Sequence, residues 1–387
     1  MTNGKIAWLG FTCNNQFGTK PSAVISTAQG SWQANQAYNL VTSEYDDCNV
    51  YEQTGDNTFN WTNYDAYVAW ANGIPNGSHR IYWDGIGGPS ANYWYTGLSA
   101  SAALNGWANA CQAMKARTPA SVTIYVNTVN EIFSRSIGAT GGQWPFLNAI
   151  TRTTSPSQAQ INSAMVQIHT TARNNLSPNF KIGFNDWGTL CNVGFPGSYH
   201  NVVSQSQSLG SALYNAGLLD WIGEEGYQLD STPTATVQAG LNSWHSLCPN
   251  AEYHLTEFSP ASSSGSYSGG AAVAFNGVQS VLATWQRYIS IFQGAANGFG
   301  INGPWWLKAS AVGGISSNYG DSCTINDSVT PNQQQPFFAW FVANKSSFLA
   351  PASGGGGSPA PTISSISPTQ GKVAGGETIN IVGANFN

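Results

Sequence analysis

Short apolar runs of β type alternate with helix-like stretches along most of this chain of 387 residues. The apolar runs predict strands at residues 6–11, 39–42, 79–83, 122–126, 181–184, 221–223, 253–256 and 298–301. The other stretches predict helices at residues 64–71, 99–115, 158–174, 203–216, 234–245, 273–292 and 335–344. Strands that alternate with helices form a parallel sheet, and eight such units favour an α/β fold in which the sheet closes into a (β/α)8 TIM barrel.

The composition is poor in charge and rich in aromatic rings. Asp, Glu, Lys and Arg make up 8% of the residues, against about 25% in an average globular protein. Disordered chains contain few aromatic residues, whereas here aromatics reach 12%, with 15 tryptophans. We therefore expect a folded protein whose surface consists largely of Asn, Ser, Thr, Gln and Gly. Such a surface suits an extracellular protein that handles a neutral polar substrate.

The charge and hydropathy patterns exclude two classes of partner. The formal net charge is −5 and no basic block occurs, so we expect no nucleic-acid partner, because that binding needs a basic footprint. No apolar run approaches the roughly 18 residues that a membrane span needs, so we expect no membrane partner. Residues 1–5 lead into an apolar run without the pattern of a signal peptide. We interpret Met1 as a trimmed start and expect a secreted, monomeric protein.

The six cysteines predict no metal site. None forms a CxxC pair or a cluster with histidine, which argues against zinc, and we expect no metal or other cofactor. Cys13 and Cys48 follow the first two predicted strands, which would be neighbours in a barrel. A disulfide between them is one of fifteen possible pairings, and the sequence leaves open whether it forms. If disulfides form, the compartment is oxidising.

The composition changes after Ala350, and we divide the chain there. Residues 1–350 are the expected barrel, and residues 351–361 are a linker rich in Gly, Pro and Ser. Residues 362–387 read as short alternating strands, too few to fold alone. This tail resembles the opening half of an IPT/TIG domain in residues 366–368 and 375–386. We expect a truncated all-β segment of immunoglobulin type.

Two glutamates follow predicted strands. Glu131 comes after the fourth strand in the string Asn130-Glu131, and Glu257 after the seventh in Thr256-Glu257. In TIM barrels catalytic residues lie at the carboxyl ends of the strands. A retaining glycosidase needs one carboxylic acid to protonate the leaving oxygen and a second carboxylate to attack the anomeric carbon. Taken singly, either glutamate could also be a residue of a surface loop.

The barrel resembles glycoside hydrolase family 10, whose best-known members are endo-β-1,4-xylanases. The resemblance is distant and rests on residues 59–71, 126–133, 184–187, 221–228, 255–258 and 304–308. One position within the second of these motifs departs from the family, because Asn127 stands where Asp is usual.

The resemblance implies a role for each matching residue. Glu131 would be the acid/base and Glu257 the nucleophile. Asn130 would bond the sugar 2-hydroxyl beside the scissile bond, Glu44 would bind a hydroxyl in the next subsite, and Asn185 would line the cleft. The remaining candidate substrate-binding residues are Trp83, Asp84, Glu225, Tyr227, Trp305 and Trp306. For the tryptophans, packing in the core is the open alternative.

Further departures from the family lie on the glycone side of the expected cleft. The family usually has Asn and Lys where Tyr45 and Cys48 stand. It usually has His at the position of Asp84, and Gln and His at those of Glu225 and Tyr227. The two expected catalytic glutamates match the family.

We expect a retaining glycoside hydrolase of β-1,4-linked polysaccharide, most simply an endo-β-1,4-xylanase whose partner is its polysaccharide. A β-glucanase or a hydrolase of small glycosides on the same barrel is the alternative enzyme. A non-catalytic carbohydrate-binding protein is the alternative of another class. Loss of one catalytic glutamate would favour that class, and both are present.

Overall fold

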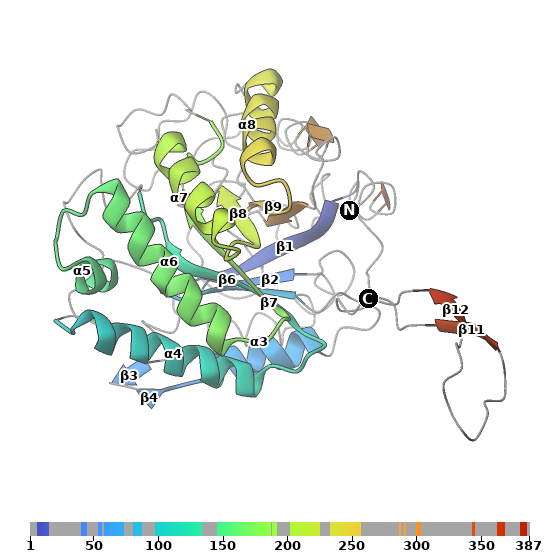
Figure 1. The fold of residues 1–387 in the computed structure, drawn as a ribbon, viewed down its shortest axis with the longest axis horizontal. Coiled ribbons are helices and arrows are strands. Elements are labelled where there is room, and N and C mark those ends of the chain that lie inside the picture. Colours follow the sequence, from blue (N-terminus) through green and yellow to red (C-terminus); the bar gives the residue numbers. More distant parts are fainter. Residues whose placement is uncertain are drawn as a thin grey trace, which may run out of the picture.

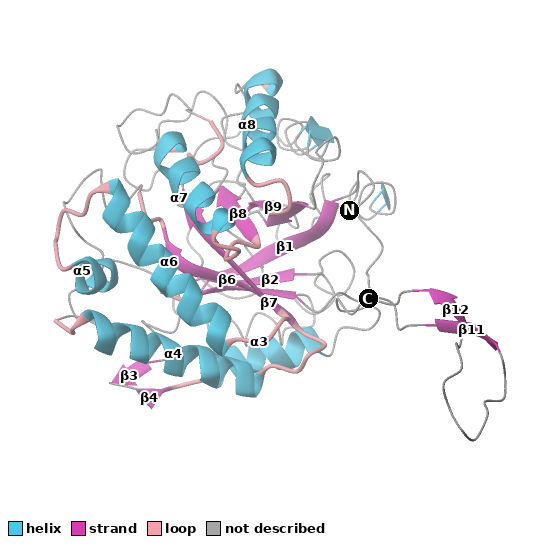
Figure 2. Ribbon diagram, in the orientation of Figure 1, coloured by secondary structure: helices cyan, strands magenta, loops and turns pink. Residues whose placement is uncertain are grey.

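The computed structural model is described over residues 6–14, 40–44, 53–55, 58–72, 80–86, 97–133, 145–186, 188–191, 202–224, 233–256, 286–287, 290–291, 299–302, 343–344, 362–367 and 380–384. Its centre is a closed barrel of eight parallel strands. The described helices lie along the outside of part of this barrel (Figures 1 and 2). The predicted TIM barrel is confirmed.

The barrel strands fall where the apolar runs predicted them. Their bounds are β1 (Ile6–Asn14), β2 (Leu40–Glu44), β5 (Arg80–Asp84), β6 (Thr123–Asn130), β7 (Phe180–Asp186), β8 (Trp221–Glu224), β9 (Glu252–Leu255) and β10 (Phe299–Asn302). Each strand pairs with the next barrel strand along the chain, and β10 pairs with β1 to close the ring. The register of β6 against β7 shifts between Asn127 and Asn130, which marks a bulge at the carboxyl end of β6.

Five of the predicted helices are present within a few residues of their expected ends. The helices are α3 (Thr62–Asn72), α4 (Ala100–Arg117), α5 (Pro145–Thr151), α6 (Gln158–Asn175), α7 (Val203–Asn215) and α8 (Thr234–Leu247). Ser157 and Gln160 form a capping box that begins α6. The sequence did not predict α5 or the hairpin of β3 (Gln53–Gly55) and β4 (Thr58–Phe59). The expected helices at residues 273–292 and 335–344 lie mostly outside the described residues.

The main core lies between the barrel wall and the helices. Alternate residues of a strand point to opposite faces, so on β6 Ile124 and Val126 join this core while Tyr125 points into the barrel. Inside, the Trp221 ring stacks on His254 with centroids 5.2 Å apart. Glu252 accepts a hydrogen bond from the Tyr125 hydroxyl at 3.0 Å and lies 2.8 Å from His254 Nε2. The barrel is therefore filled at this level by packed and paired side chains.

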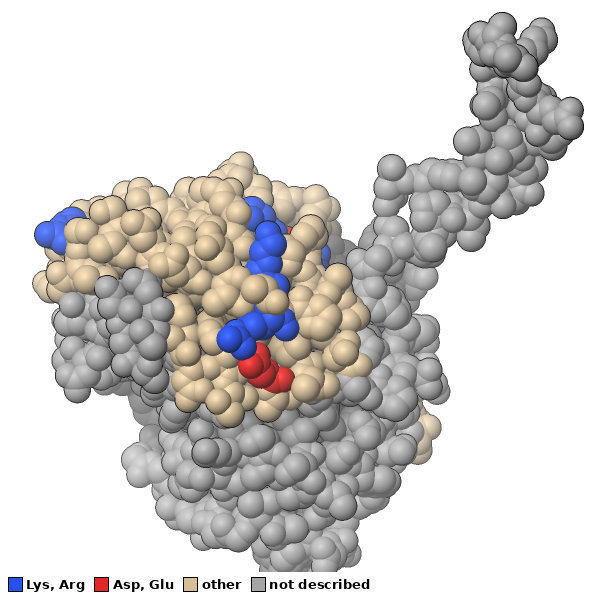
Figure 3. All heavy atoms as spheres, turned by 90° about the horizontal axis from the view of Figure 1, so that it is seen from below, with Lys and Arg blue, Asp and Glu red and all other residues tan. Residues whose placement is uncertain are grey.

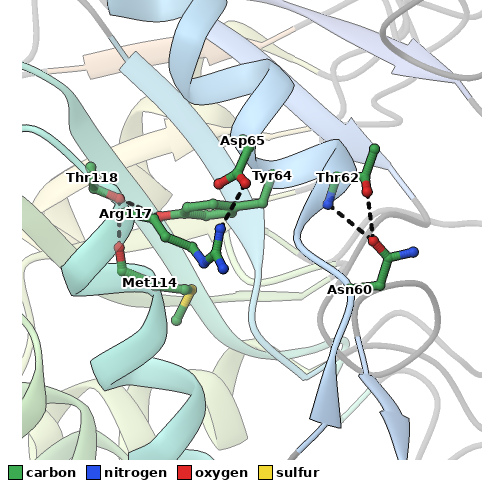
Figure 4. Close-up of polar contacts among 7 residues, drawn as sticks. All are labelled: Asn60, Thr62, Tyr64, Asp65, Met114, Arg117 and Thr118. Carbon is green, nitrogen blue, oxygen red and sulfur yellow. Dashed lines mark hydrogen bonds and ion pairs between the residues drawn. The ribbon is translucent and has the colours of Figure 1, made fainter.

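Helix α3 packs against β5. Figure 4 shows the polar contacts that join α3 to the carboxyl end of α4. The Thr118 hydroxyl donates to the Met114 carbonyl oxygen at 2.8 Å, so the Tyr64 hydroxyl donates to Thr118 at 2.6 Å. Arg117 pairs with Asp65 at 2.7 Å on the exposed side of the same helices. Few of the described residues on the face drawn in Figure 3 are charged, as the composition predicted.

Other expectations concern the cysteines, the tail and the membrane. Cys111 and Cys248 are free thiols, and both are buried, as is Cys191. Cys48 lies outside the described residues, so the pairing with Cys13 stays a prediction. In the tail, β11 (Thr362–Ser367) and β12 (Asn380–Ala384) pair antiparallel. Among the described helices, none combines the length and apolar character needed to cross a membrane.

Candidate active site

Polar side chains from β6, β7 and the end of β9 meet inside the mouth of the barrel. Asn127 and Asn130 come from β6, Asn185 from β7, and Thr256 directly follows β9. Asn127, Asn185 and Thr256 are completely buried. Gly223 on β8 leaves them room, because a β-carbon there would lie 2.7 Å from Asn185 Oδ1 and 2.9 Å from Thr256 Cγ2. This position therefore requires glycine.

Hydrogen bonds join these four side chains into one network. Asn130 Oδ1 accepts from Asn127 Nδ2 and from Asn185 Nδ2, each at 2.8 Å. Asn127 Oδ1 accepts from the backbone N–H of Asn185 at 3.0 Å. Thr256 donates through its hydroxyl to Asn185 Oδ1. Because buried polar groups are costly unless paired, the network holds each amide in one orientation.

Glu131 follows this network and is nine-tenths buried, with 9% of its surface exposed. Its backbone φ is 50°, in the left-handed region that non-glycine residues rarely adopt. The backbone N–H of Glu131 donates to the Asn185 carbonyl oxygen at 3.0 Å, and Asn130 Nδ2 lies 3.4 Å from Glu131 Oε2. Uncommon backbone conformations persist where the surroundings determine them, often at functional sites. The bulge and β7 therefore set the direction of this carboxyl group.

Asp186, the last residue of β7, holds the turn after Glu131. Its completely buried carboxylate accepts the backbone N–H of Phe133 at 2.5 Å. Hydrogen bonds from backbone N–H groups to a carboxylate are charge-assisted and stronger than neutral ones. The segment from Glu131 to Phe133 is thus bonded to β7 at both its first and its last residue.

A second buried carboxylate, Glu224, holds the turn after β7. Its oxygens accept from the backbone N–H of Gly188 at 3.1 Å and of Leu190 at 2.9 Å, and from the Thr189 hydroxyl at 2.9 Å. Since that hydroxyl donates to Glu224, the Tyr253 hydroxyl donates to Thr189 at 2.8 Å. Burial and then the charge of Glu224 raise the pKa of Tyr253 well above its usual value. Glu224 is therefore a structural residue and does not reach the cleft.

His169 of α6 supports β6 from outside the barrel. Its Nδ1 donates to the Leu218 carbonyl oxygen at 3.0 Å, so Nε2 accepts from the Thr128 hydroxyl at 2.8 Å. Burial lowers the pKa of His169 to about 4. At neutral pH it is an uncharged core residue with both ring nitrogens bonded.

The structure brings three of the expected site residues together, namely Asn130, Glu131 and Asn185. Trp83 is a correction, because it is completely buried and packs edge-on against Tyr64 of α3, with ring centroids 4.9 Å apart. It belongs to the core between the wall and α3, not to a sugar-binding surface. Glu44 and Asp84 are the last residues of β2 and β5, and their side chains lie outside the described part. So do the following residues entirely: Glu225, Tyr227, Glu257, Trp305 and Trp306.

Four residues that form or support the site were not predicted to do so, namely Asn127, Asp186, Glu224 and Thr256. Only their positions in the sequence could have indicated two of them, because Asn127 stands three residues before Asn130 and Thr256 directly before Glu257. Asp186 and Glu224 end strands, but they point away from the barrel axis. A polar residue at a strand end thus serves the site or its support, depending on which face of the strand it occupies. Within the described ranges, no three His, Cys, Asp or Glu residues cluster closely enough to hold a metal ion.

Several solved structures similar to this chain are xylanases. A thermostable mutant of a xylanase from Cellvibrio japonicus is 17% identical, with a TM-score of 0.63, over 87% of this chain and 97% of that one. An endo-1,4-β-xylanase from Penicillium canescens is 17% identical, with a TM-score of 0.61, over 91% and 97%. The CBM22-1 and GH10 modules of a Clostridium thermocellum endo-1,4-β-D-xylanase, complexed with xylohexaose, are 14% identical, with a TM-score of 0.61.

The last of these alignments covers 88% of this chain and 66% of the two-module structure. At such identities the likeness establishes the fold, and the expected resemblance to family 10 xylanases is confirmed at that level. The IPT/TIG domain family matches residues 361–387, which confirms the resemblance of the tail. No curated protein sequence matches this chain.

Proposed function

We propose that this protein is a retaining glycoside hydrolase that cleaves β-1,4-linked polysaccharide, with xylan as its substrate. The observation that carries the proposal is the placement of Glu131. This carboxyl group lies at the carboxyl end of the fourth barrel strand, nine-tenths buried and beside the Asn130 amide. In a barrel of this kind, that end of the strands is where catalysis takes place. The fold shared with xylanases supports xylan as the first substrate to test.

The chemistry follows from two carboxyl groups with different protonation states. Glu131 would begin protonated and give its proton to the glycosidic oxygen as the bond to the anomeric carbon breaks. Glu257 would attack that carbon as a carboxylate and form a glycosyl ester. In the second step Glu131, now ionised, would take a proton from a water molecule as the water oxygen attacks the anomeric carbon. The bond from that carbon to Glu257 breaks, which leaves Glu257 as a carboxylate and Glu131 protonated again.

The site needs water to be excluded around the leaving oxygen, and the described geometry supports this. Asn127, Asn185 and Thr256, the side chains of the network beside Glu131, are themselves completely buried. Neutral amides and hydroxyls suit an uncharged sugar, whose hydroxyl groups both donate and accept hydrogen bonds. The low surface charge also supports secretion, and we propose that the protein acts as a secreted monomer.

A panel of soluble polysaccharides tests the proposal. The protein should release reducing ends from xylan, and Glu257→Ala should lose nearly all turnover. Proton NMR of the first product should show the β-anomer, since two displacements retain configuration. An initial α-anomer would contradict retention, and release from β-glucan alone would favour a glucanase. Retardation in affinity gels without reducing ends would identify a binding protein instead.

A further inference from the structure

The orientation of the Asn130 amide is fixed by a chain of contacts that starts at a backbone group. A backbone N–H can only donate, so the Asn127 atom that faces Asn185 N at 3.0 Å is the side-chain oxygen. The other end of the Asn127 amide is therefore its NH2 group. That NH2 group lies 2.8 Å from the side chain of Asn130, which must present its oxygen to accept it.

A second donor points to the same oxygen. Asn185 Nδ2 lies 2.8 Å from Asn130 Oδ1, and since Asn130 presents its oxygen there, Asn185 must present its NH2 group. The Asn185 oxygen then accepts from the Thr256 hydroxyl. With its oxygen bonded twice on the inner side, Asn130 turns its NH2 group outward. The atom it meets there is Glu131 Oε2, at 3.4 Å.

We propose that Asn127 is a positioning residue that decides which end of the Asn130 amide faces Glu131. With Asn at position 127, the NH2 end faces the carboxyl group and offers it a hydrogen-bond donor. A carboxylate only accepts hydrogen bonds, so this NH2 group can bond to Glu131 when Glu131 acts as a base in the second step. The inference rests on the proposed function where it concerns catalysis, and on the hydrogen bonds alone where it concerns orientation.

The substitution Asn127→Asp tests the proposal because it removes the NH2 group and keeps the shape. One Asp oxygen can still accept from Asn185 N, but the other would face Asn130 Oδ1 across 2.8 Å with no hydrogen between them. A coupled rotation of the Asn130 and Asn185 amides by half a turn relieves this repulsion. Asn185 then offers its oxygen to Asn130 and its NH2 group to the Thr256 hydroxyl, which can donate to the Glu224 carbonyl oxygen at 3.1 Å instead. The Asn130 carbonyl oxygen would then face Glu131, and the Glu131 carboxylate would lose its hydrogen-bond donor.

Neutron diffraction from deuterated crystals of the full chain shows the orientation directly. In the wild type, deuterons on Asn127 and Asn185 should both point at Asn130 Oδ1. In Asn127→Asp, the Asn130 amide should be reversed. An Asn130 nitrogen facing Asn127 in the wild type, or an unreversed amide in the variant, would overturn the proposal.

The pH dependence of turnover tests the effect on Glu131, with Asn127→Leu as the matched control. In Asn127→Asp the alkaline limb of the profile of turnover against pH should move to higher pH by about one unit. Two changes contribute, namely the loss of the Asn130 donor and the new negative charge at position 127. Asn127→Leu leaves Asn130 held by Asn185 and should lower stability without moving the limb. A limb that moves equally in both variants, or in neither, would show that Asn127 is only structural. A wild type that hydrolyses no glycoside would refute the proposed function and leave the neutron result standing.

Discussion

The backbone N–H of Glu131 donates to the carbonyl oxygen of Asn185 over 3.0 Å, across the pair of strands β6 and β7. The bond lies beyond the bulge in β6, where Glu131 has the left-handed φ of 50°. A side chain in a long loop would have many positions open to it, whereas this one begins from backbone fixed to the neighbouring strand. The barrel itself, through β7, thus sets the position of the proposed acid.

Replacing Asp186 should disturb Glu131 from a distance. Asp186→Ala removes the acceptor of the Phe133 N–H and leaves that donor buried, which costs about 1–3 kcal/mol of stability. Turnover should also fall, because the turn that carries Glu131 loses one of its two bonds to β7. Urea denaturation and kcat on xylan measure the two effects.

The matched control is Asp65→Ala, which breaks an exposed ion pair with Arg117. Such pairs contribute at most about 1 kcal/mol, and this one joins two half-exposed side chains on α3 and α4 (Figure 4). Equal losses of kcat in the two variants would show that Asp186 has no special connection with Glu131.

Glu224→Gln should be strongly destabilising although it changes few atoms. The carboxylate accepts two backbone N–H groups and one hydroxyl, and a Gln NH2 group would face at least one of these donors. Charge-assisted hydrogen bonds of this kind contribute about 1.5–3 kcal/mol each, so we expect a loss of about 2–4 kcal/mol in urea denaturation. A change below about 0.5 kcal/mol, the size typical of neutral surface substitutions, would mean that the turn after β7 does not depend on Glu224.

His169 should make stability depend on pH. The unfolded chain binds a proton near pH 6.5, whereas the buried ring binds it only near pH 4. Between these values the unfolded state holds more protons, so stability falls as the pH falls. The shift corresponds to a loss of about 3 kcal/mol between pH 7 and pH 4.

His169→Gln removes this titration, and His245→Gln, at an exposed position of α8, is the control. The free energy of unfolding of each variant should be measured from pH 7 to pH 4. The fall should be about 3 kcal/mol smaller in His169→Gln than in the wild type, and unchanged in His245→Gln. Parallel curves for the wild type and both variants would contradict the buried neutral ring.

The barrel strands could be predicted because parallel strands are buried on both faces and read as apolar runs. The end of β6 could not. The apolar run stops at Val126, yet the strand continues to Asn130, because Asn127 pairs inside the barrel and Thr128 pairs with His169. Buried polar residues that form hydrogen bonds with one another give the same pattern in the sequence as the polar residues of a loop.

The error at Trp83 has a related cause. A tryptophan near a strand end suits both a sugar-binding cleft and a core, and only the face it occupies decides between them. Tyr82 packs against Trp221 inside the barrel, so Trp83, one residue on, points outward to α3. Asn130 and Glu131 were predictable because their motif fixed their order at the strand end.

The most direct test of the central claim compares two substrates of Glu131→Ala. Dinitrophenyl glycosides have a leaving group that departs without a proton, whereas the sugar leaving group of xylan needs one. If Glu131 is the acid, the variant should keep kcat/KM on the dinitrophenyl glycoside within about tenfold and lose about 10²–10⁴-fold on xylan. Equal losses on the two substrates, or full activity on xylan, would contradict the assignment of Glu131.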